Sequence, residues 1–383
     1  MHEKAQTKIK DTIREILITP AIAFTGRAGH FDFSLYEVLE NELNKRKIKF
    51  KIDKLSCWII FDGAKKHYFQ DKSITDAQAI NDFVDTLCSI YCETPMDYSI
   101  DFHFRNLKID INPIDYEFVS IRAGEDIGIG LFAEKEKYAI ASIKKNGYLS
   151  GGYPSSFIKS ILQDLKIFIF LIKSINLIKT GKTNLASTLF QSMSGHADTI
   201  KIDCVNVKYP WMNSSVHISE SVGKFLHNFI FNYEFEEGYI IEKIDHSLQL
   251  MNAIVKDESK EALRIKAAID WLVQSEITDD ETMSFIQICM GLESIFGDDD
   301  YEGGLTNILS DRCAYLIGNK IKERRFIKDT FKKIYQVRSK IVHGVRNHLS
   351  DDELYFRHLA YSYLERSILK EIQNLDLQSH QAT

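Results

Sequence analysis

The chain has no surplus of positive charge, since its 383 residues carry a formal net charge of −6. This balance excludes a polycation that would bind nucleic acid indiscriminately along its whole length. The chain also has no long uncharged hydrophobic run. Lysines and an aspartate interrupt its most apolar stretch, residues 157–178, whereas a bilayer span needs about 20 nearly uncharged residues. Residues 1–10 are polar and charged, unlike a secretory signal. We therefore expect a soluble, cytoplasmic protein with no membrane partner.

The six cysteines do not have the spacing of a disulfide framework. They are scattered, several of them in apolar runs, which favours reduced thiols in the core of a cytosolic protein. Cys88 and Cys92 lie one helical turn apart, a spacing that could hold two metal ligands, but no second Cys/His pair follows at a finger-like distance. Core packing is the favoured interpretation, and we predict neither a metal site nor a cofactor.

A phosphate-binding loop is absent as well. Residues 181–183 (GKT) resemble the end of such a loop, but Asn176 stands where the motif requires glycine. The segment also follows a predicted helix, whereas a phosphate-binding loop follows a strand. These two departures argue against a nucleotide site at this place.

The composition allows two folded domains, because 44% of the residues are hydrophobic and 11% are aromatic. In the first part of the chain, residues 99–104 alternate between polar and apolar, the pattern of a half-buried strand. Similar patterns predict further strands at 47–52, 56–61, 107–111, 127–132, 138–143 and 200–207, and helices at 1–16, 156–179 and about 219–231. Turns are expected at Asp62-Gly63, Asn112-Pro113 and Asn146-Gly147. Residues 1–238 are thus predicted to form a mixed α/β domain rich in antiparallel strands, with a sensing or regulatory role assigned by elimination.

Helical signals dominate the rest of the chain, from residue 239 to 383. Residues 278–281 and 350–353 have the pattern of capping boxes and precede apolar-periodic runs at 281–296 and 352–374. A further helix is predicted at 258–276, and two apolar stripes end at Gly318 and Gly344, where glycine would supply a left-handed cap. Roughly five helices joined by short loops predict a compact helical bundle. The fold class expected for the whole chain is therefore α+β.

One segment of this bundle carries a pattern with catalytic potential, because Arg338 precedes His343 by five residues at the end of a predicted helix. Four phrases occur in order around it: residues 268–272 (AIDWL), 291–297 (GLESIFG), 311–314 (DRCA) and 338–344 (RSKIVHG). Together they resemble the Apea-like branch of the HEPN ribonuclease superfamily. The resemblance implies a dimeric helical domain that cleaves RNA in phage defence by abortive infection, with Arg338 and His343 as catalytic residues. Ser339 stands where the wider superfamily often has Asn, Asp or His.

The residue types themselves suit RNA cleavage without a metal. The 2′-hydroxyl of RNA can attack the adjacent phosphorus, and His343 could transfer the protons. The guanidinium of Arg338 could hold the phosphoryl oxygens in a bidentate grip as negative charge develops. On a helix, five residues separate the two side chains by about 140° and about 7 Å, so they flank a groove. The expected products are a 2′,3′-cyclic phosphate and a 5′-hydroxyl, with DNA inert.

Structural roles explain the same residues. Arg338 could pair with a buried carboxylate, and His343 could be a helix-end residue favoured by the helix dipole. Glu293 and Arg312 both occupy predicted buried positions, which favours an ion pair between them over a role in shaping the cleft. These alternatives remain open at the level of the sequence.

Positive charge is concentrated just before the motif. Between Lys320 and Lys340 there are nine Lys and Arg residues against two acidic residues. Lys332, Lys333 and Lys340 are therefore candidates for binding RNA, although a solvated helix face explains them equally well. Tyr335 could stack on a base, but core filling is the favoured interpretation. Two rival functions stay open: a HEPN fold kept only for dimerisation or binding, and a toxin controlled by a separate antitoxin.

Overall fold

A computed structural model of the protein describes residues 3–19, 22–23, 30–31, 33–46, 51–104, 107–127, 135–148, 156–180, 201–217, 222, 229–232, 234–297 and 304–381. It contains a six-stranded sheet and a series of helices, the last six of which follow one another without an intervening strand. This confirms the predicted α+β class with a helical C-terminal region. Within the described part of the chain, none of the helices has both the length and the hydrophobicity needed to cross a lipid bilayer.

The chain divides into two compact units that are interleaved in sequence. The first comprises residues 1–103, 140–162 and 201–218, and the second comprises residues 104–139, 163–200 and 219–383. The division at 238/239 proposed from the sequence stays a prediction.

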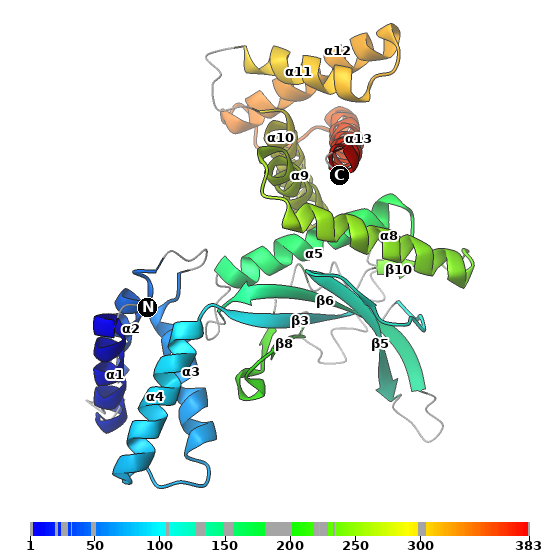
Figure 1. Ribbon diagram of the computed structural model, residues 1–383. Coiled ribbons are helices and arrows are strands. Elements are labelled where there is room, and N and C mark those ends of the chain that lie inside the picture. Colours follow the sequence, from blue (N-terminus) through cyan, green and yellow to red (C-terminus); the bar gives the residue numbers. More distant parts are fainter. Residues whose placement is uncertain are drawn as a thin grey trace, which may run out of the picture. The chain divides into compact units, whose positions relative to one another are not determined.

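Four helices open the first unit: α1 (Glu3–Ile18), α2 (Ser34–Leu43), α3 (Lys54–Tyr68) and α4 (Ala77–Glu93) (Figure 1). The amphipathic helix predicted at residues 1–16 is confirmed, with Ile9, Ile13 and Ile16 buried at helical spacing. The strand predicted at 56–61 is wrong, because these residues belong to α3. The Asp53 side chain accepts a hydrogen bond from the Ser56 amide at 2.6 Å and begins the helix.

The main sheet has the strand order β4-β5-β6-β3-β8-β9. Its strands are β3 (Met96–Phe104), β4 (Ile114–Asp115), β5 (Val119–Ile127), β6 (Lys135–Gly147), β8 (Lys201–Asn206) and β9 (Ser214–His217). Strand β8 pairs antiparallel with both β3 and β9, with Ile100 opposite Cys204 and Ile202 opposite Val216. Between β8 and β9 lies the short 3-10 helix η1 (Pro210–Met212), and two small sheets pair β1 (Ile22–Ala23) with β2 (His30–Phe31) and β7 (Ile178–Thr180) with β10 (Phe229–Phe231).

These strands confirm the predictions at 99–104, 138–143 and 200–207. No strand forms at 107–111, and the Leu107 amide donates to the Phe104 carbonyl at 2.9 Å. The helix expected near 219–231 is wrong at its end, since residues 229–231 form β10. Parts of three predicted elements lie outside the described residues. They are residues 47–50 of the first predicted strand, 128–132 of the strand predicted at 127–132, and 219–221 and 223–228 of the helix expected near 219–231.

Two of the predicted turns are instead sites of close packing inside regular elements. Asp62-Gly63 lies within α3, and Asn146-Gly147 ends β6. A Cβ atom on Gly63 would lie 3.0 Å from the indole ring of Trp211, and one on Gly147 would lie 2.1 Å from the ring of Phe157. Glycine is needed at both places because it lets an aromatic ring approach the backbone.

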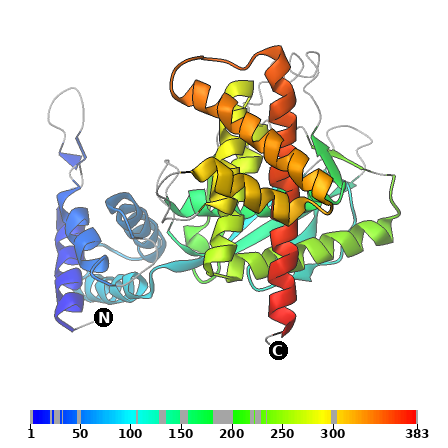
Figure 2. The ribbon, with the colours of Figure 1, turned by 90° about the horizontal axis from the view of Figure 1, so that it is seen from above.

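The second unit contains α5 from residue 163 onward and the six helices α8 to α13. Figure 1 shows that α9 to α13 lie together. The helices are α5 (Ser156–Ser174), α8 (Glu237–Lys256), α9 (Lys260–Ile277), α10 (Glu281–Phe296), α11 (Leu305–Ile317), α12 (Ile321–Val342) and α13 (Asp351–Gln381). The last helix, red in Figure 2, contacts α9, α10, α11 and α12. Phe285, Leu292, Phe331 and Leu364 are fully buried between these helices and form their core.

Charged side chains tie α5 to the helical region. Lys166 on α5 bonds Asp270 at 2.6 Å and Gln274 at 3.0 Å, both on α9. Lys173, two turns further along α5, pairs with Glu276 and donates to the Tyr361 hydroxyl of α13 at 3.2 Å. We call these six side chains the α5 seam.

The helix ends agree only in part with the predicted signals. Glu353 accepts from the Ser350 amide at 3.1 Å, which confirms one half of the second capping box. In the first box the cap is Asp280, whose carboxylate accepts from the Met283 amide at 2.7 Å, and not Thr278. Gly344 has the predicted left-handed conformation, with φ of 70°, whereas Gly318 has φ of −92° and extended backbone. The left-handed cap predicted at Gly318 is therefore wrong.

Candidate functional site

The helix α12 carries both residues of the Arg-x4-His pattern. Its buried stripe includes Phe331, Ile334 and Val337, and this stripe fixes α12 against the other helices. Arg338 lies next to the stripe, with its side chain 27% exposed. The left-handed backbone at Gly344 ends the helix, and this makes His343 the C-terminal cap residue. The side chain of His343 is exposed. The same helix end therefore places a half-buried guanidinium and an exposed imidazole near each other in sequence.

Arg338 forms an ion pair with Glu293 of α10. Its Nη2 atom lies 3.1 Å from Oε1 and 3.4 Å from Oε2 of the carboxylate, which is 29% exposed. The Nε atom of Arg338 is buried and has no hydrogen-bond partner among the described residues. The guanidinium is thus balanced on one side by a carboxylate and is still partly open to solvent. Pairing with a carboxylate is what we expected for Arg338 if its role were structural and not catalytic.

Arg312 and Glu293 are not the ion pair that we predicted. The ion pair that the structure shows for Glu293 is with Arg338, whereas Arg312 of α11 donates from Nη1 to the Phe296 carbonyl at 2.6 Å. Arg312 therefore contacts the last turn of α10, three residues beyond Glu293. Carbonyl groups in that turn have no partner within their own helix, so the guanidinium supplies one.

Tyr335 belongs to the core beneath the ion pair. Its side chain is 7% exposed, and its ring is stacked on Phe331 with centroids 4.8 Å apart. Its hydroxyl donates to the Cys289 carbonyl at 3.4 Å. Burial raises the pKa of Tyr335 well above its ordinary value, and the nearby Cys289 and Glu293 raise this pKa further. These contacts agree with core filling, the alternative to base stacking.

The other candidates lie along the same helix. Lys333 and Lys340 are exposed, and Lys332 and Ser339 are half-buried. The carbonyl of Ser339 accepts from the His343 amide at 3.0 Å, so Ser339 holds the helix end through its backbone. Other basic residues of α12 have partners in the fold, for instance Lys328, which pairs with Asp311 at 2.5 Å. Part of the positive charge before the motif is therefore used within the helical region.

Sequence reasoning missed Arg346, which fixes the segment after the helix. Its Nη1 atom lies 2.6 Å from Oε2 of Glu353, and its amide donates to the Lys340 carbonyl at 3.2 Å. Burial alone would raise the pKa of Glu353, but hydrogen bonds from Ser350 and the charge of Arg346 together lower it. The predicted capping box at 350–353 was the available signal, because its Glu353 carboxylate also accepts from Arg346.

One chain supplies one exposed imidazole and one partly exposed guanidinium at this place. A 2′-hydroxyl attack requires a group that removes a proton and a group that donates one to the leaving oxygen. A single imidazole can perform these steps only in turn, and a second copy of the site would supply both at once. The described residues contain no grouping of three or more His, Cys, Asp or Glu side chains that could hold a metal ion.

Comparison of the chain with models of known protein families, with curated proteins and with solved structures finds no match.

Proposed function

We propose that this protein is a HEPN-type endoribonuclease that cleaves RNA without a metal, with Arg338 and His343 as its catalytic residues. The observation that carries the proposal is the end of α12, where Arg338 is partly open to solvent and His343 is exposed at the helix cap. The four phrases that resemble the superfamily add support, since Glu293 and Arg338 from two of them form an ion pair between α10 and α12, and Arg312 from a third bonds the last turn of α10.

In the proposed reaction, His343 accepts the proton of the 2′-hydroxyl, which attacks the adjacent phosphorus. The bond to the 5′-oxygen breaks, and a second imidazole protonates that oxygen. Arg338 stabilises the phosphoryl oxygens as charge accumulates. The products are a 2′,3′-cyclic phosphate and a 5′-hydroxyl, with tRNA or mRNA as candidate substrates. We propose a homodimer, in which a twofold axis brings two arginines and two histidines to one cleft.

The biological role follows from the family resemblance. We propose a cytoplasmic protein of phage defence, in which the region before residue 239 holds the ribonuclease inactive until a trigger binds. Cleavage of RNA would then stop translation in the infected cell. Exposed Lys333 and Lys340 are the proposed contacts for the RNA backbone, with Lys332 beside them.

The test is cleavage of total cellular RNA and purified tRNA in EDTA by the full chain, alone and with an extract of phage-infected cells as the source of the trigger. We compare the wild type with Arg338→Ala, His343→Ala and the matched control His358→Ala, an exposed histidine of α13 with no assigned role. Fragments that end in cyclic phosphate are expected from the wild type and from His358→Ala, but not from the other two. Equal fragmentation by all four proteins would contradict the assignment of Arg338 and His343.

The ion pair between Arg338 and Glu293 favours a second candidate, a non-catalytic HEPN module for dimerisation or for binding RNA or protein. In that case Arg338→Ala lowers the stability of the helical region and no variant cleaves RNA. A toxin inhibited by a separate antitoxin would instead be recognised by growth arrest on expression. That arrest should disappear in His343→Ala and on co-expression of the antitoxin.

A further inference from the structure

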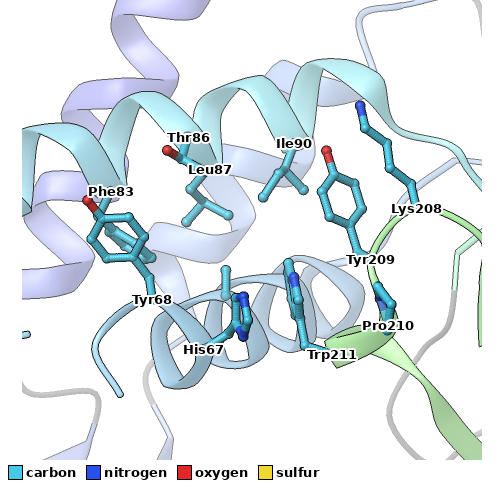
Figure 3. Close-up of a pocket in the computed structure, with 11 residues that line it drawn as sticks. His67, Tyr68, Phe83, Thr86, Leu87, Ile90, Lys208, Tyr209, Pro210 and Trp211 are labelled. Atoms are coloured by element: carbon cyan, nitrogen blue, oxygen red, sulfur yellow. The ribbon is translucent and has the colours of Figure 1, made fainter. Parts of the chain in front are cut away.

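A cavity of about 490 Å³ opens in the first unit, far in sequence from the α12 motif (Figure 3). It lies between α3, α4 and the segment that enters η1. The buried side chains of Phe83, Leu87 and Ile90 come from α4, and the ring of Trp211 faces them from the opposite side. Its volume falls within the range of about 300–1,000 Å³ typical of small-molecule sites, and its apolar lining with a few polar groups is also typical.

Trp211 is held in place before any ligand arrives. Its indole ring is stacked on the His67 imidazole, with centroids 5.8 Å apart and an interplanar angle of 14°. On the α3 side it lies against Gly63, where a Cβ atom would be only 3.0 Å away. A glycine inside a helix is unfavourable by about 1 kcal/mol relative to alanine, so its presence here has a packing reason. The aromatic wall of the cavity is therefore preorganised.

The segment before η1 is fixed in the same way. The side-chain oxygen of Asn206 accepts from the amides of Lys208 at 3.0 Å and of Tyr209 at 2.7 Å. The ring of Tyr209 then lies 5.6 Å from that of Trp211, tilted by 51°. Because the two rings are tilted, they form two adjoining walls and do not cover each other.

One end of the cavity is polar. There the cavity is lined by Lys208 and Tyr209. Both donate to Oε2 of Glu93, which lies behind them and is not a lining residue, the ammonium at 2.6 Å and the hydroxyl at 2.7 Å. The hydrogen bond from Lys208, and to a smaller extent that from Tyr209, lowers the pKa of Glu93. The carboxylate of Glu93 in turn raises the pKa of Lys208. The Lys208 ammonium keeps further protons to donate toward the cavity that it lines. Figure 3 shows Lys208 and Tyr209 at one end of the row of lining residues and Tyr68 and Phe83 at the other.

We propose that this cavity binds a planar heteroaromatic ring of nucleobase size. The ring stacks on Trp211 over the apolar side chains of α4, with Tyr209 tilted against its edge, and an acceptor of the ring bonds the Lys208 ammonium. An aliphatic ligand would bury apolar surface here but gain no ring stacking, whereas a planar ring with an acceptor on its edge can both stack on Trp211 and accept from the Lys208 ammonium. The ring is either that of a free nucleoside or nucleotide, or an unstacked base of a single strand. The inference does not rest on the ribonuclease proposal.

The test is a titration of the full chain with adenosine, guanosine, cytidine and uridine, with a mixed-sequence single-stranded hexanucleotide, and with ribose as the sugar control. Heat of binding gives the dissociation constant. Quenching of Trp211 in a Trp58→Phe/Trp271→Phe background, which leaves it the sole tryptophan, reports contact with the ring. At least one nucleoside or the hexanucleotide should quench Trp211 saturably, and ribose should not. Binding of the hexanucleotide alone would identify the source as a base within a strand.

The variants separate stacking from folding. Trp211→Ala should weaken binding by about tenfold or more, because stacking of a base on an aromatic side chain carries a large share of such affinities. Trp211→Phe keeps a ring and should lose less than about threefold. Tyr239→Ala, an exposed aromatic residue of α8, is the matched control and should bind like the wild type. The proposal is overturned if no nucleoside or hexanucleotide binds at about 10 mM, or if Trp211→Ala binds as tightly as the wild type while thermal melting shows it folded.

Discussion

Replacing Glu293 by Gln separates the catalytic and the structural role of Arg338. Glutamine keeps the size of the side chain and one oxygen acceptor but removes the charge that faces the guanidinium at 3.1 Å. If Arg338 acts on RNA, the variant retains the catalytic group and should keep activity within about tenfold of the wild type. Arg338→Ala should lose at least about 100-fold, the effect of removing one group that stabilises charge in a transition state.

The structure also bounds the stability of this pair. Hydrogen bonds to charged groups contribute about 1.5–3 kcal/mol, whereas solvent-exposed ion pairs contribute about 0–1 kcal/mol. The two side chains are 27% and 29% exposed, so the pair lies between these limits. In a double-mutant cycle of Arg338→Ala and Glu293→Gln, we expect a coupling free energy of about 1 kcal/mol.

Urea unfolding followed by the fluorescence of Trp271 measures this coupling. Trp271 lies in α9, and the other two tryptophans, Trp58 and Trp211, are replaced by Phe in all four proteins of the cycle. A coupling free energy below about 0.3 kcal/mol, the usual error of additivity, would refute the view that Glu293 holds Arg338. Loss of activity in Glu293→Gln as complete as in Arg338→Ala would refute the assignment of the catalytic role to Arg338 alone.

Two further predictions concern packing and pH. In Gly147→Ala the new Cβ would lie 2.1 Å from the ring of Phe157, where ordinary contact begins near 3.4 Å, so unfolding should require about 1–3 kcal/mol less free energy. Gly238→Ala, with nothing within 4 Å, should be neutral or slightly stabilising, and an equal loss in both variants would contradict the packing explanation. Because the folded pKa of Glu353 is lowered, its contribution to stability is present above the unfolded pKa near 4.5 and is lost as the pH falls through the folded pKa. Thermal melting from pH 7 to pH 3 should therefore show a smaller loss of stability in Glu353→Gln than in the wild type, and parallel curves would contradict this linkage.

The sequence predicted elements whose signals are local. Alternation in residues 99–104 indicated β3, and periodicity after the capping-box pattern at 278–281 indicated α10, although the residue that caps it is Asp280 and not Thr278. It failed at α3, because the apolar run at residues 56–61 is too short to distinguish a strand from a helix by its period. The glycines at 63 and 147 were misread for a different reason. Their function depends on aromatic rings that arrive from distant parts of the chain, and no local pattern reports them.

In the candidate site, too, the local features were predictable from the sequence and the contacts between distant residues were not. The helix end at Gly344 followed from local backbone preferences, and the structure has it. The partner of Glu293 was not predictable, because Arg312 and Arg338 both occupied apolar stripes of neighbouring helices. Only the packing of α10 against α12 brings Arg338 to the carboxylate across 45 residues of sequence.

The α5 seam determines how the helical region should be isolated for biochemistry. A shortened chain that begins at residue 239 would carry Asp270 and Glu276 without Lys166 and Lys173, their lysine partners from α5. Glu276 is only 12% exposed in the full chain, and without α5 it would lose the ion pair with Lys173. In such a fragment α9 would lack its ion pairs with α5. Inactivity of the fragment could then result from the missing helix and would say nothing about the catalytic residues. Retaining residues 163–180 preserves both lysines.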